Sequence, residues 1–442
     1  MHTLPRDGLA LSSLDEQLLP PGTKGLPLTE PLRQGAIGLQ GWNVLHGDTS
    51  FPVAVLKASA LAHNLAWMKA FCERHGATLA PHGKTTMSPQ LFAAQLANGA
   101  WGITLASATQ VQVAHRFNVR RVLLANQLVA RADIEAVLAL LHDDPDFECF
   151  VLADSLDGVA RLEQAVVARK LARPLPVLVE LGLAGKRAGC RTSEEAMVVA
   201  RAVAQADGLA LVGFEGYEGL LVSDNREADI RAVKAFLAEL VDLVEMADEQ
   251  QLFGGAEILI SAGGSSYFDL VARGFAGMEG LSRPVRAVLR SGCYLTSDHG
   301  SYKRLLAQLD AREAREAQGE GLRPALEVWS TVQSRPEPGL AILTMGKRDA
   351  GYDEALPTPL FSHRPGSDAA APSDLPPGCE IFKMNDQHAY LRLPEGDIRA
   401  TLQVGDLVGC GISHPCTTFD KWQVLLAVDD TYNVLEALNT FF

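Results

Sequence analysis

The 442-residue sequence predicts an α/β fold, in which a (β/α)8 barrel of the TIM type is followed by a C-terminal antiparallel β domain. Two observations predict it. From about residue 50 to about residue 300, short runs rich in β-branched residues alternate with segments of helical period. Beyond that point the apolar runs become short and alternating, with Gly and Pro between them, as in antiparallel strands.

The first region contains eight strand candidates, and each is followed by a segment of helical period. They cover residues 78–82, 101–107, 121–126, 148–154, 176–183, 210–216, 257–263 and 285–292. Amphipathic helices are expected between them, for example at 88–99 and 226–250. This order favours a closed barrel, with a doubly wound open sheet as the alternative, because a sequence pattern does not show closure.

The second region supplies the candidate antiparallel strands. These cover residues 325–334, 340–346, 379–393 and 406–416, after a charged break at 311–321. A segment rich in Pro, Ala and Ser at 361–378 is expected to be a mobile surface loop. The predicted domains are an N-terminal segment (1–48) that packs on the β domain, the barrel (49–305) and the β domain (306–442).

Composition and charge narrow the function. Hydrophobic residues make up 47% of the chain and charged residues 21%, as in ordinary globular proteins. The formal net charge of −14 argues against nucleic acid or an anionic membrane as the main partner, so a small molecule is the expected ligand. The first residues lack the pattern of a signal peptide, and we expect a cytoplasmic protein. The seven cysteines are scattered without a disulfide framework, so most are expected to be buried as small hydrophobic residues.

The chemistry of a barrel enzyme lies where its strands end, and Lys84 follows the first strand candidate, close to His82. A lysine facing the barrel mouth can act as a nucleophilic amine. The alternative is a surface lysine that begins a helix.

The seventh strand candidate ends in Gly263 and Gly264, which are followed by Ser265 and Ser266. Two glycines let the backbone approach an anion closely, although they also suit a simple tight turn between strand and helix. A lysine nucleophile and a phosphate cradle in one barrel mouth indicate pyridoxal 5'-phosphate, bound at both ends.

An ordered series of motifs resembles the fold-type III pyridoxal phosphate enzymes of the alanine racemase superfamily. The resemblance is to the branch that contains D-threonine aldolase and the metal-dependent D-serine dehydratases (deaminases). It spans about residues 50 to 430, and rests on PHGKTTMSPQLFAAQLANGAWGITLAS (81–107), LGLAGKRAG (181–189), FEGYEGL (214–220), SAGGSS (261–266), LRSGCYLTSD (289–298), NDQHAYL (385–391) and GDLVGCGISHPCTTFD (405–420).

The resemblance implies roles for the matching residues. Lys84 is the lysine that bonds to the cofactor, Arg187 lies near its phenolic oxygen, and Tyr217 contacts it at the barrel mouth. The phosphate is held by Gly263, Gly264 and Ser265, and weaker additions to the cofactor site are Gln127 and Tyr294. The alternatives are a surface ion pair for Arg187 and core positions for the two tyrosines.

The same family places a divalent metal beside the cofactor, and the matching ligands here are His414 and Cys416. On an extended strand, residues i and i+2 point to the same face, so both side chains could reach one ion. Imidazole and thiolate suit Zn²⁺, although another divalent metal remains open. A pair of protein ligands indicates a catalytic or an incomplete site, because structural zinc sites usually have four. His388 aligns with a family histidine, but Asn385, Asp386 and Gln387 replace the usual acidic neighbours, so it is either a partner of the site or a strand histidine.

The resemblance implies a lyase of the D-serine ammonia-lyase type, which converts D-serine, and secondarily D-threonine, to the 2-oxo acid and ammonia. Cysteine as the second metal ligand favours dehydration, because the family's aldolases carry aspartate there. A D-threonine aldolase or a 3-hydroxyaspartate dehydratase is the alternative; an amino-acid racemase or a non-catalytic cofactor carrier fits less well. The resemblance also implies a homodimer whose active site lies at the subunit interface.

Overall fold

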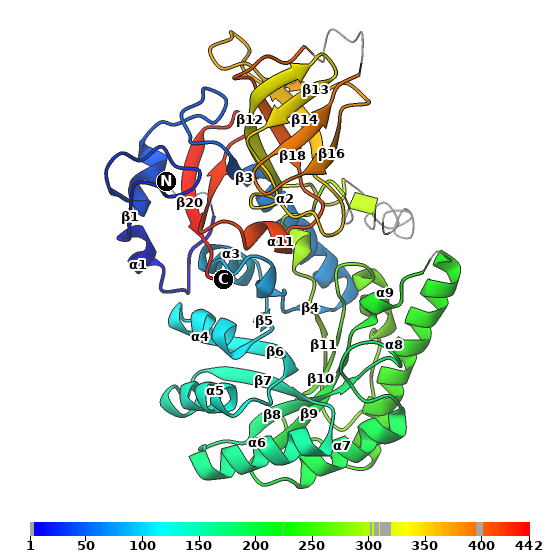
Figure 1. Ribbon diagram of the computed structural model, residues 1–442. Coiled ribbons are helices and arrows are strands. Elements are labelled where there is room, and N and C mark those ends of the chain that lie inside the picture. The colour runs from blue at the N-terminus through cyan, green and yellow to red at the C-terminus, as the bar shows by residue number, and fades with distance from the viewer. Residues whose placement is uncertain (1–3, 224, 301–302, 305–308, 310–319, 395–400) are drawn as a thin grey trace. The chain divides into compact units, whose positions relative to one another are not determined.

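The computed structural model describes residues 4–223, 225–300, 303, 304, 309, 320–394 and 401–442 (Figure 1). The chain forms two compact units. We call Met68–Lys84 with Gln95–Gly292 the barrel unit, and Met1–Trp67 with Thr85–Ala94 and Cys293–Phe442 the β unit. Most of the charged break predicted at 311–321 lies outside the described residues.

Eight parallel strands form the sheet of the barrel unit, as the sequence predicts. The strands are β4 (Thr78–Leu79), β5 (Ile103–Leu105), β6 (Arg121–Gln127), β7 (Glu148–Ala153), β8 (Leu175–Leu181), β9 (Leu209–Gly216), β10 (Ile258–Ala262) and β11 (Val285–Leu289). Their order is β4-β11-β10-β9-β8-β7-β6-β5, and every pairing is parallel. His82, just beyond β4, forms a parallel bridge with Thr104 of β5. The two edges of the curled sheet therefore meet, which confirms the barrel over an open sheet.

A layer of buried side chains fills the space inside this sheet. It consists of Ala80, Leu123, Leu152, Leu178, Val212, Leu259 and Val288, which come from successive strands or from the residue after one. Branched aliphatic residues in such layers are typical of barrels, whose interior is packed rather than open.

Helices connect the strands. They are α2 (Ala58–His75), α3 (Pro89–Ala97), α4 (Ala108–Arg116), α5 (Arg131–Asp143), α6 (Leu156–Arg169), α7 (Ser193–Gln205), α8 (Arg226–Glu249) and α9 (Phe268–Gly274). Four begin at a side chain that accepts a backbone N–H of the first turn: Ser107, Ser155, Thr192 and Asn225 for α4, α6, α7 and α8. These caps fix where each helix starts relative to the strand before it.

The β unit contains a ten-stranded sheet in which nearly all pairings are antiparallel. Its strands are β3 (Val53–Lys57), β12 (Leu326–Glu337), β13 (Leu340–Leu343), β14 (Thr358–His363), β15 (Ser373–Asp374), β16 (Glu380–Met384), β17 (Ala389–Arg392), β18 (Leu407–Gly411), β19 (Val424–Val428) and β20 (Val434–Asn439). Although β3 precedes every barrel strand in the chain, it pairs antiparallel with β12 and parallel with β19.

The segment 361–378 is a surface loop only in part, because its first residues and residues 373–374 are strands. Its first residues complete β14, and Phe361 and Ser362 pair with Asp374 and Ser373 of β15. The apolar Phe361 packs against the buried core of the sheet, where its ring stacks on Trp329 with the centroids 6.4 Å apart. Phe361 therefore ties the start of the segment to the sheet, while residues 364–372 form the expected exposed connection.

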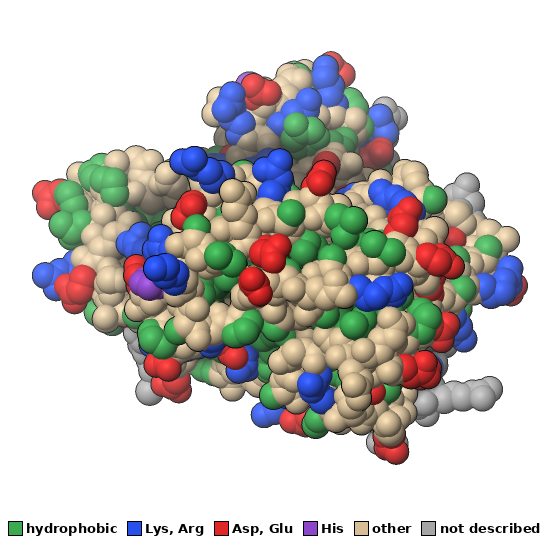
Figure 2. Space-filling view, turned by 90° about the horizontal axis from the view of Figure 1, so that it is seen from below, with side chains coloured by type: hydrophobic (Ala, Val, Ile, Leu, Met, Phe, Trp, Pro, Cys, Tyr) green, Lys and Arg blue, Asp and Glu red, His purple; other side chains and the backbone are tan. Residues whose placement is uncertain are grey.

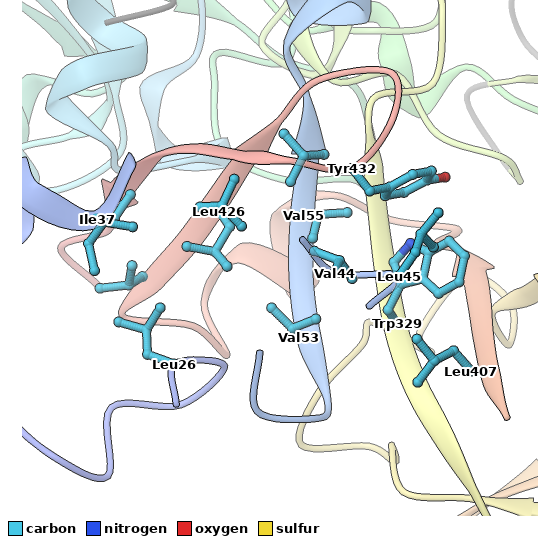
Figure 3. Close-up of a cluster of buried hydrophobic side chains, with 14 of the residues drawn as sticks. Leu26, Ile37, Val44, Leu45, Val53, Val55, Trp329, Leu407, Leu426 and Tyr432 are labelled. Carbon is cyan, nitrogen blue, oxygen red and sulfur yellow. The ribbon is translucent and has the colours of Figure 1, made fainter. Parts of the chain in front are cut away.

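The core of the β unit joins the N-terminal segment to the sheet (Figure 3). Leu26, Ile37 and Val44 pack with sheet residues such as Trp329 and Leu426. The segment itself forms α1 (Ser12–Asp15), β1 (Leu18–Leu19), β2 (Leu32–Arg33) and the 3-10 helix η1 (Gln34–Leu39). These short elements are stable only because their apolar side chains enter this core.

The surface is mixed in charge on the face drawn in Figure 2, where Lys and Arg side chains are interspersed with Asp and Glu side chains. This interspersion weakens the attraction of that face for a polyanion. Among the described residues, no helix has the length and apolar character that a bilayer span requires.

Candidate active site

Lys84 lies in the 3-10 helix η2 (Gly83–Thr85), two residues beyond the bridge that closes the barrel. Its side chain is half-buried and makes no hydrogen bond or ion pair with another described residue. A half-buried amine without such a partner can form a covalent bond to a cofactor without first breaking a hydrogen bond or an ion pair.

The pKa of His82 shows which positive charges lie near this ring, and Lys84 is one of them. The pKa of His82 is well below its ordinary value, first because the ring is buried, and then because Lys84, Arg290 and Arg187 are positively charged. The ring is therefore neutral at pH 7. Its Nδ1 is buried and has no hydrogen-bond partner among the described residues. An unsatisfied buried nitrogen at this position is a free contact point for a polar ligand.

Gln127 contacts Glu180 near the carboxyl end of β8, and the charge of Arg187 also acts on this carboxyl group. The side-chain amide of Gln127 donates a hydrogen bond to Glu180. Burial raises the pKa of Glu180, while this hydrogen bond and the charges of Arg290 and Arg187 oppose the rise. The structure thus brings the sequence-predicted Gln127 into contact with this carboxylate.

The sequence interpretation missed a buried ion pair between Arg290 and Glu215. The Arg290 side chain is 6% exposed and the Glu215 side chain is 2% exposed. Arg290 also donates to the backbone oxygen of Gly216 at 2.8 Å. Burial lowers the pKa of Arg290 to about 10, so the side chain still carries its charge at neutral pH. The available signal was a charged residue near the end of each of two strand candidates, Glu215 in 210–216 and Arg290 in 285–292, because a buried charge needs a partner.

Tyr217, Arg187 and Gly264 form a second group in the barrel unit. The Arg187 guanidinium lies 4.6 Å from the centroid of the Tyr217 ring. A Cβ atom at Gly264 would approach that ring to 2.5 Å, so only glycine fits there. The ring therefore rests directly on the glycine turn, which is followed by the half-buried Ser265.

The backbone amides of this turn have a partner that the sequence interpretation missed. Gly263 and Gly264 each donate to the carboxylate of Glu218 at 3.0 Å. Glu218 is completely buried, and burial raises its pKa while the two N–H groups oppose the rise. The two amides therefore bind an anion already, and Ser265 is the remaining predicted group for a phosphate.

These residues fit pyridoxal phosphate chemically. Lys84 offers a free amine for an aldehyde, the unpartnered Nδ1 of His82 offers a polar contact, and Arg187 offers a positive charge. The three side chains are near enough to influence one another, since the charges of Lys84 and Arg187 both lower the pKa of His82.

The second candidate group lies in the β unit, and its local structure differs from the prediction. His414 and Cys416 are not on a strand, because β18 ends at Gly411 and Cys416 begins the short helix α11 (Cys416–Phe419). Pro415 between them has helical backbone angles. The two side chains are nevertheless close, because each shifts the pKa of the other: Cys416 raises that of His414, and His414 lowers that of Cys416.

Asp353 orients the His414 ring. Its carboxylate contacts the ring Nδ1 at 2.6 Å and accepts the Thr417 hydroxyl at 2.6 Å. The pKa of His414 is raised to about 9, first by the hydrogen bond with Cys416 and then by Asp353. A carboxylate behind a histidine ring is the usual support of a metal ligand, and it leaves Nε2 for the ion.

Cys416 has two further neighbours. Its Sγ lies 3.7 Å from Sγ of Cys293 and 3.4 Å from the Thr85 hydroxyl. The pKa of Cys416 is well below its ordinary value because its interactions with Cys293, and then with His414 and Thr85, outweigh the opposing effect of burial. Thiolate and imidazole are donors that suit Zn²⁺. No three His, Cys, Asp or Glu side chains of the described residues already form a metal cage.

Two weaker candidates take other places in the β unit. Tyr294 is buried in the 3-10 helix η4 (Cys293–Leu295). His388 is half-buried in the turn between β16 and β17, where its backbone oxygen accepts the N–H of Asn385 at 2.9 Å. Within the described residues, no hydrogen bond or ion pair joins His388 to His414 or Cys416.

Two known protein families match two separate regions of the chain. Residues 56–268 match the alanine racemase N-terminal domain, and residues 325–428 match the family described as "Putative serine dehydratase domain". The chain carries these two domains in that order. Lys84, Arg187 and Tyr217 lie in the first matched region, and His414 and Cys416 lie in the second. Cys293 lies between the two matched regions.

The chain with these two domains is similar to two curated enzymes and to a solved structure. A 3-hydroxy-D-aspartate aldolase of Paracoccus denitrificans (strain Pd 1222) is 26% identical, over 69% of this chain and 74% of the relative. A D-threonine aldolase of an Arthrobacter species is 26% identical, over 86% of this chain and 89% of the relative. A variant of D-threo-3-hydroxyaspartate dehydratase, solved in a metal-free form, has a TM-score of 0.68 and is 20% identical. The match covers 89% of this chain and 97% of that structure. The structural likeness establishes the shared alanine racemase-like fold.

Proposed function

We propose that the protein is a pyridoxal phosphate- and metal-dependent lyase of D-β-hydroxy amino acids, and that its main reaction is the dehydration of D-serine to pyruvate and ammonia. The observation that carries the proposal is the contact between His414 and Cys416, with Asp353 behind the histidine ring. It occurs in a chain whose alanine racemase N-terminal domain places the uncommitted Lys84 at the end of a barrel strand.

Lys84 is the residue that would hold the cofactor and accept the proton from the substrate Cα. Bound pyridoxal phosphate supplies an aldehyde for the substrate amine and a sink for the charge that develops at Cα, and a divalent cation supplies Lewis-acid assistance at the β-hydroxyl. His82 is neutral, so it can donate or accept a hydrogen bond without adding charge next to Lys84.

The remaining residues hold this arrangement in place. Arg290 is fixed by Glu215 and by the Gly216 carbonyl, so it provides a stationary positive charge. Asp353 contacts Nδ1 of His414 at 2.6 Å, which fixes the ring and would leave Nε2 to bind a cation that displaces its proton. Fixed charges of this kind need no reorganisation during the reaction.

A second candidate is an aldolase on the same scaffold, and the two curated relatives favour it because both are aldolases. The two reactions differ in the bond that breaks. Dehydration removes the Cα proton and the β-hydroxyl, whereas aldol cleavage breaks the Cα–Cβ bond and gives glycine and an aldehyde. Cys416 favours dehydration, because the resembling aldolases carry aspartate at the matching position.

One experiment separates these functions. Purified protein supplied with pyridoxal phosphate and Zn²⁺ is given D-serine, D-threonine or D-threo-3-hydroxyaspartate, with L-serine as the control. We expect 2-oxo acid and ammonia from D-serine, and loss of this activity with a chelator while the visible absorbance of the cofactor persists. Glycine as the main product would establish the aldolase, and activity unaffected by the chelator would remove the metal from the proposal.

A further inference from the structure

A second cysteine lies beside Cys416. Cys293 is 123 residues earlier in the chain, and the two Sγ atoms are 3.7 Å apart. The Thr85 hydroxyl is 3.9 Å from Sγ of Cys293 and 3.4 Å from Sγ of Cys416. Both cysteines are half-buried, and no disulfide joins them. Two thiols and a hydroxyl group therefore lie within 4 Å of one another.

The spacing of the sulfur atoms matches shared coordination. Zinc binds each thiolate sulfur at about 2.3 Å, so two sulfurs on a tetrahedral ion lie about 3.8 Å apart. A disulfide would require about 2.05 Å. The observed 3.7 Å therefore places the two sulfurs at the edge length of a tetrahedral site without any change in their separation.

Cys293 also supplies what the His414–Cys416 pair lacks. Catalytic zinc sites commonly have three protein ligands and one open position, and two cysteines with one histidine form one of the known sets. The described side chains do not yet surround a common point, so an ion has to draw at least one of them inward. A cysteine has a single side-chain torsion, which makes this a small movement.

We propose that Cys293 is the third protein ligand of the divalent cation bound by His414 and Cys416, with the fourth position left for water or the β-hydroxyl of the substrate. The inference rests on the metal in the proposed function. Two soft thiolates make the site selective for Zn²⁺ over Mn²⁺ and Mg²⁺, whose preferred ligands are oxygen atoms.

X-ray absorption at the zinc edge tests the inference because it counts sulfur neighbours of the ion directly. The samples are the zinc-loaded holoenzyme and its variants Cys293→Ser, Cys416→Ser and Cys379→Ser. We expect two sulfur neighbours in the wild type and in Cys379→Ser, which alters a cysteine outside this group of side chains, and one in each of the other two. Zinc affinity is measured by competition with a chromophoric chelator. Losing a residue that only supports a metal ligand costs about 10- to 100-fold in affinity, so we expect Cys293→Ser to weaken zinc binding by at least that much.

A Cys293→Asp variant guards against loss of folding, which circular dichroism monitors. Aspartate can bind the ion, so this variant should retain zinc more tightly than Cys293→Ser while showing one sulfur neighbour. One sulfur neighbour in the wild type, or unchanged zinc affinity in Cys293→Ser, would overturn the role of Cys293. Failure of the wild type itself to bind zinc would instead overturn the metal dependence of the proposed function.

Discussion

The carboxylate of Glu218 accepts the backbone N–H of Gly263 at 3.0 Å and, through its other oxygen, the N–H of Gly264 at the same distance. Glu218 belongs to η3 (Glu218–Leu220), which follows β9, and the two glycines follow β10. The contact therefore ties together the loops after two neighbouring barrel strands. Gly263 also has a φ of +95°, a left-handed conformation that glycine adopts without strain.

Replacing Glu218 with Gln should loosen this turn and weaken the binding of pyridoxal phosphate. The amide retains one acceptor oxygen but directs its NH₂ group at a backbone N–H, so one buried donor loses its partner at a cost of about 1 to 3 kcal/mol. Absorbance titration would measure cofactor affinity, and thermal unfolding would measure stability. Glu249→Gln, at the exposed end of α8, is the control. Unchanged cofactor affinity with lowered stability would limit Glu218 to a structural role.

Replacing Lys84 with Ala should abolish the visible absorbance of bound pyridoxal phosphate and all turnover, because the covalent attachment disappears. The fold should remain, since Lys84 makes no hydrogen bond or ion pair with another described residue. Lys234→Ala, at an exposed position of α8, should leave both properties unchanged. Residual turnover in Lys84→Ala would assign the proton transfer to another residue.

Replacing Cys416 with Asp tests whether the second metal ligand selects the reaction. Carboxylate oxygen is still a ligand for divalent ions, so some metal binding should persist. The ratio of 2-oxo acid to glycine formed from D-threonine should fall, because the aldolase branch of the resembling family carries aspartate at this position. Quantifying both products in one reaction provides the ratio independently of total activity. An unchanged ratio would show that other residues decide which bond breaks.

The barrel strands were predictable because each is a short, continuous apolar run, as expected for strands buried on both faces. All eight candidates overlap observed strands. Closure was not predictable, since it depends on a bridge between His82 and Thr104 that no periodicity encodes. Nor does the pattern of Val53–Lys57 show that it pairs with β12, 269 or more residues later, rather than with the barrel.

Some residues of the candidate site could also be predicted from the sequence, and others could not. Lys84 and the Gly263–Gly264 turn were found because they follow strands directly, which is a local signal. Asp353, Cys293 and Glu218 were missed because their importance comes from contacts with residues 61, 123 and 45 positions away. The prediction that His414 and Cys416 lie on an extended strand was wrong, because Pro415 adopts helical angles rather than extended ones.

Replacing Glu215 with Gln should destabilise the barrel unit by about 3 to 5 kcal/mol, because it leaves the Arg290 charge buried without its partner. Both side chains are at most 6% exposed, so water does not compensate the loss. The matched control is Glu380→Gln, which breaks the pair with Arg392 at a site where both side chains are more than half exposed. That change should cost no more than about 1 kcal/mol. Urea unfolding of the two variants beside the wild type gives the comparison, and equal costs would show that burial of the Arg290 pair is not what makes it important.

His299 should make the stability of the protein depend on pH below neutrality. Its ring packs on Gly411, where a Cβ atom would come within 2.3 Å, and its buried Nδ1 has no hydrogen-bond partner among the described residues. Burial, aided by the charge of Lys303, lowers the pKa of His299 from 6.5 to about 4. Above pH 6.5 the folded and unfolded states are both neutral at this ring, so nothing is lost there. As the pH falls from 6.5 towards 4, the unfolded state binds a proton that the folded state does not, and stability drops, by about 2 kcal/mol at pH 5. Urea unfolding at pH 7 and pH 5 should therefore show a smaller loss for His299→Gln than for the wild type, whereas His142→Gln, at an exposed position of α5, should lose as much as the wild type. If all three proteins lose the same stability between these pH values, the His299 ring is protonated as readily in the folded state as in the unfolded chain.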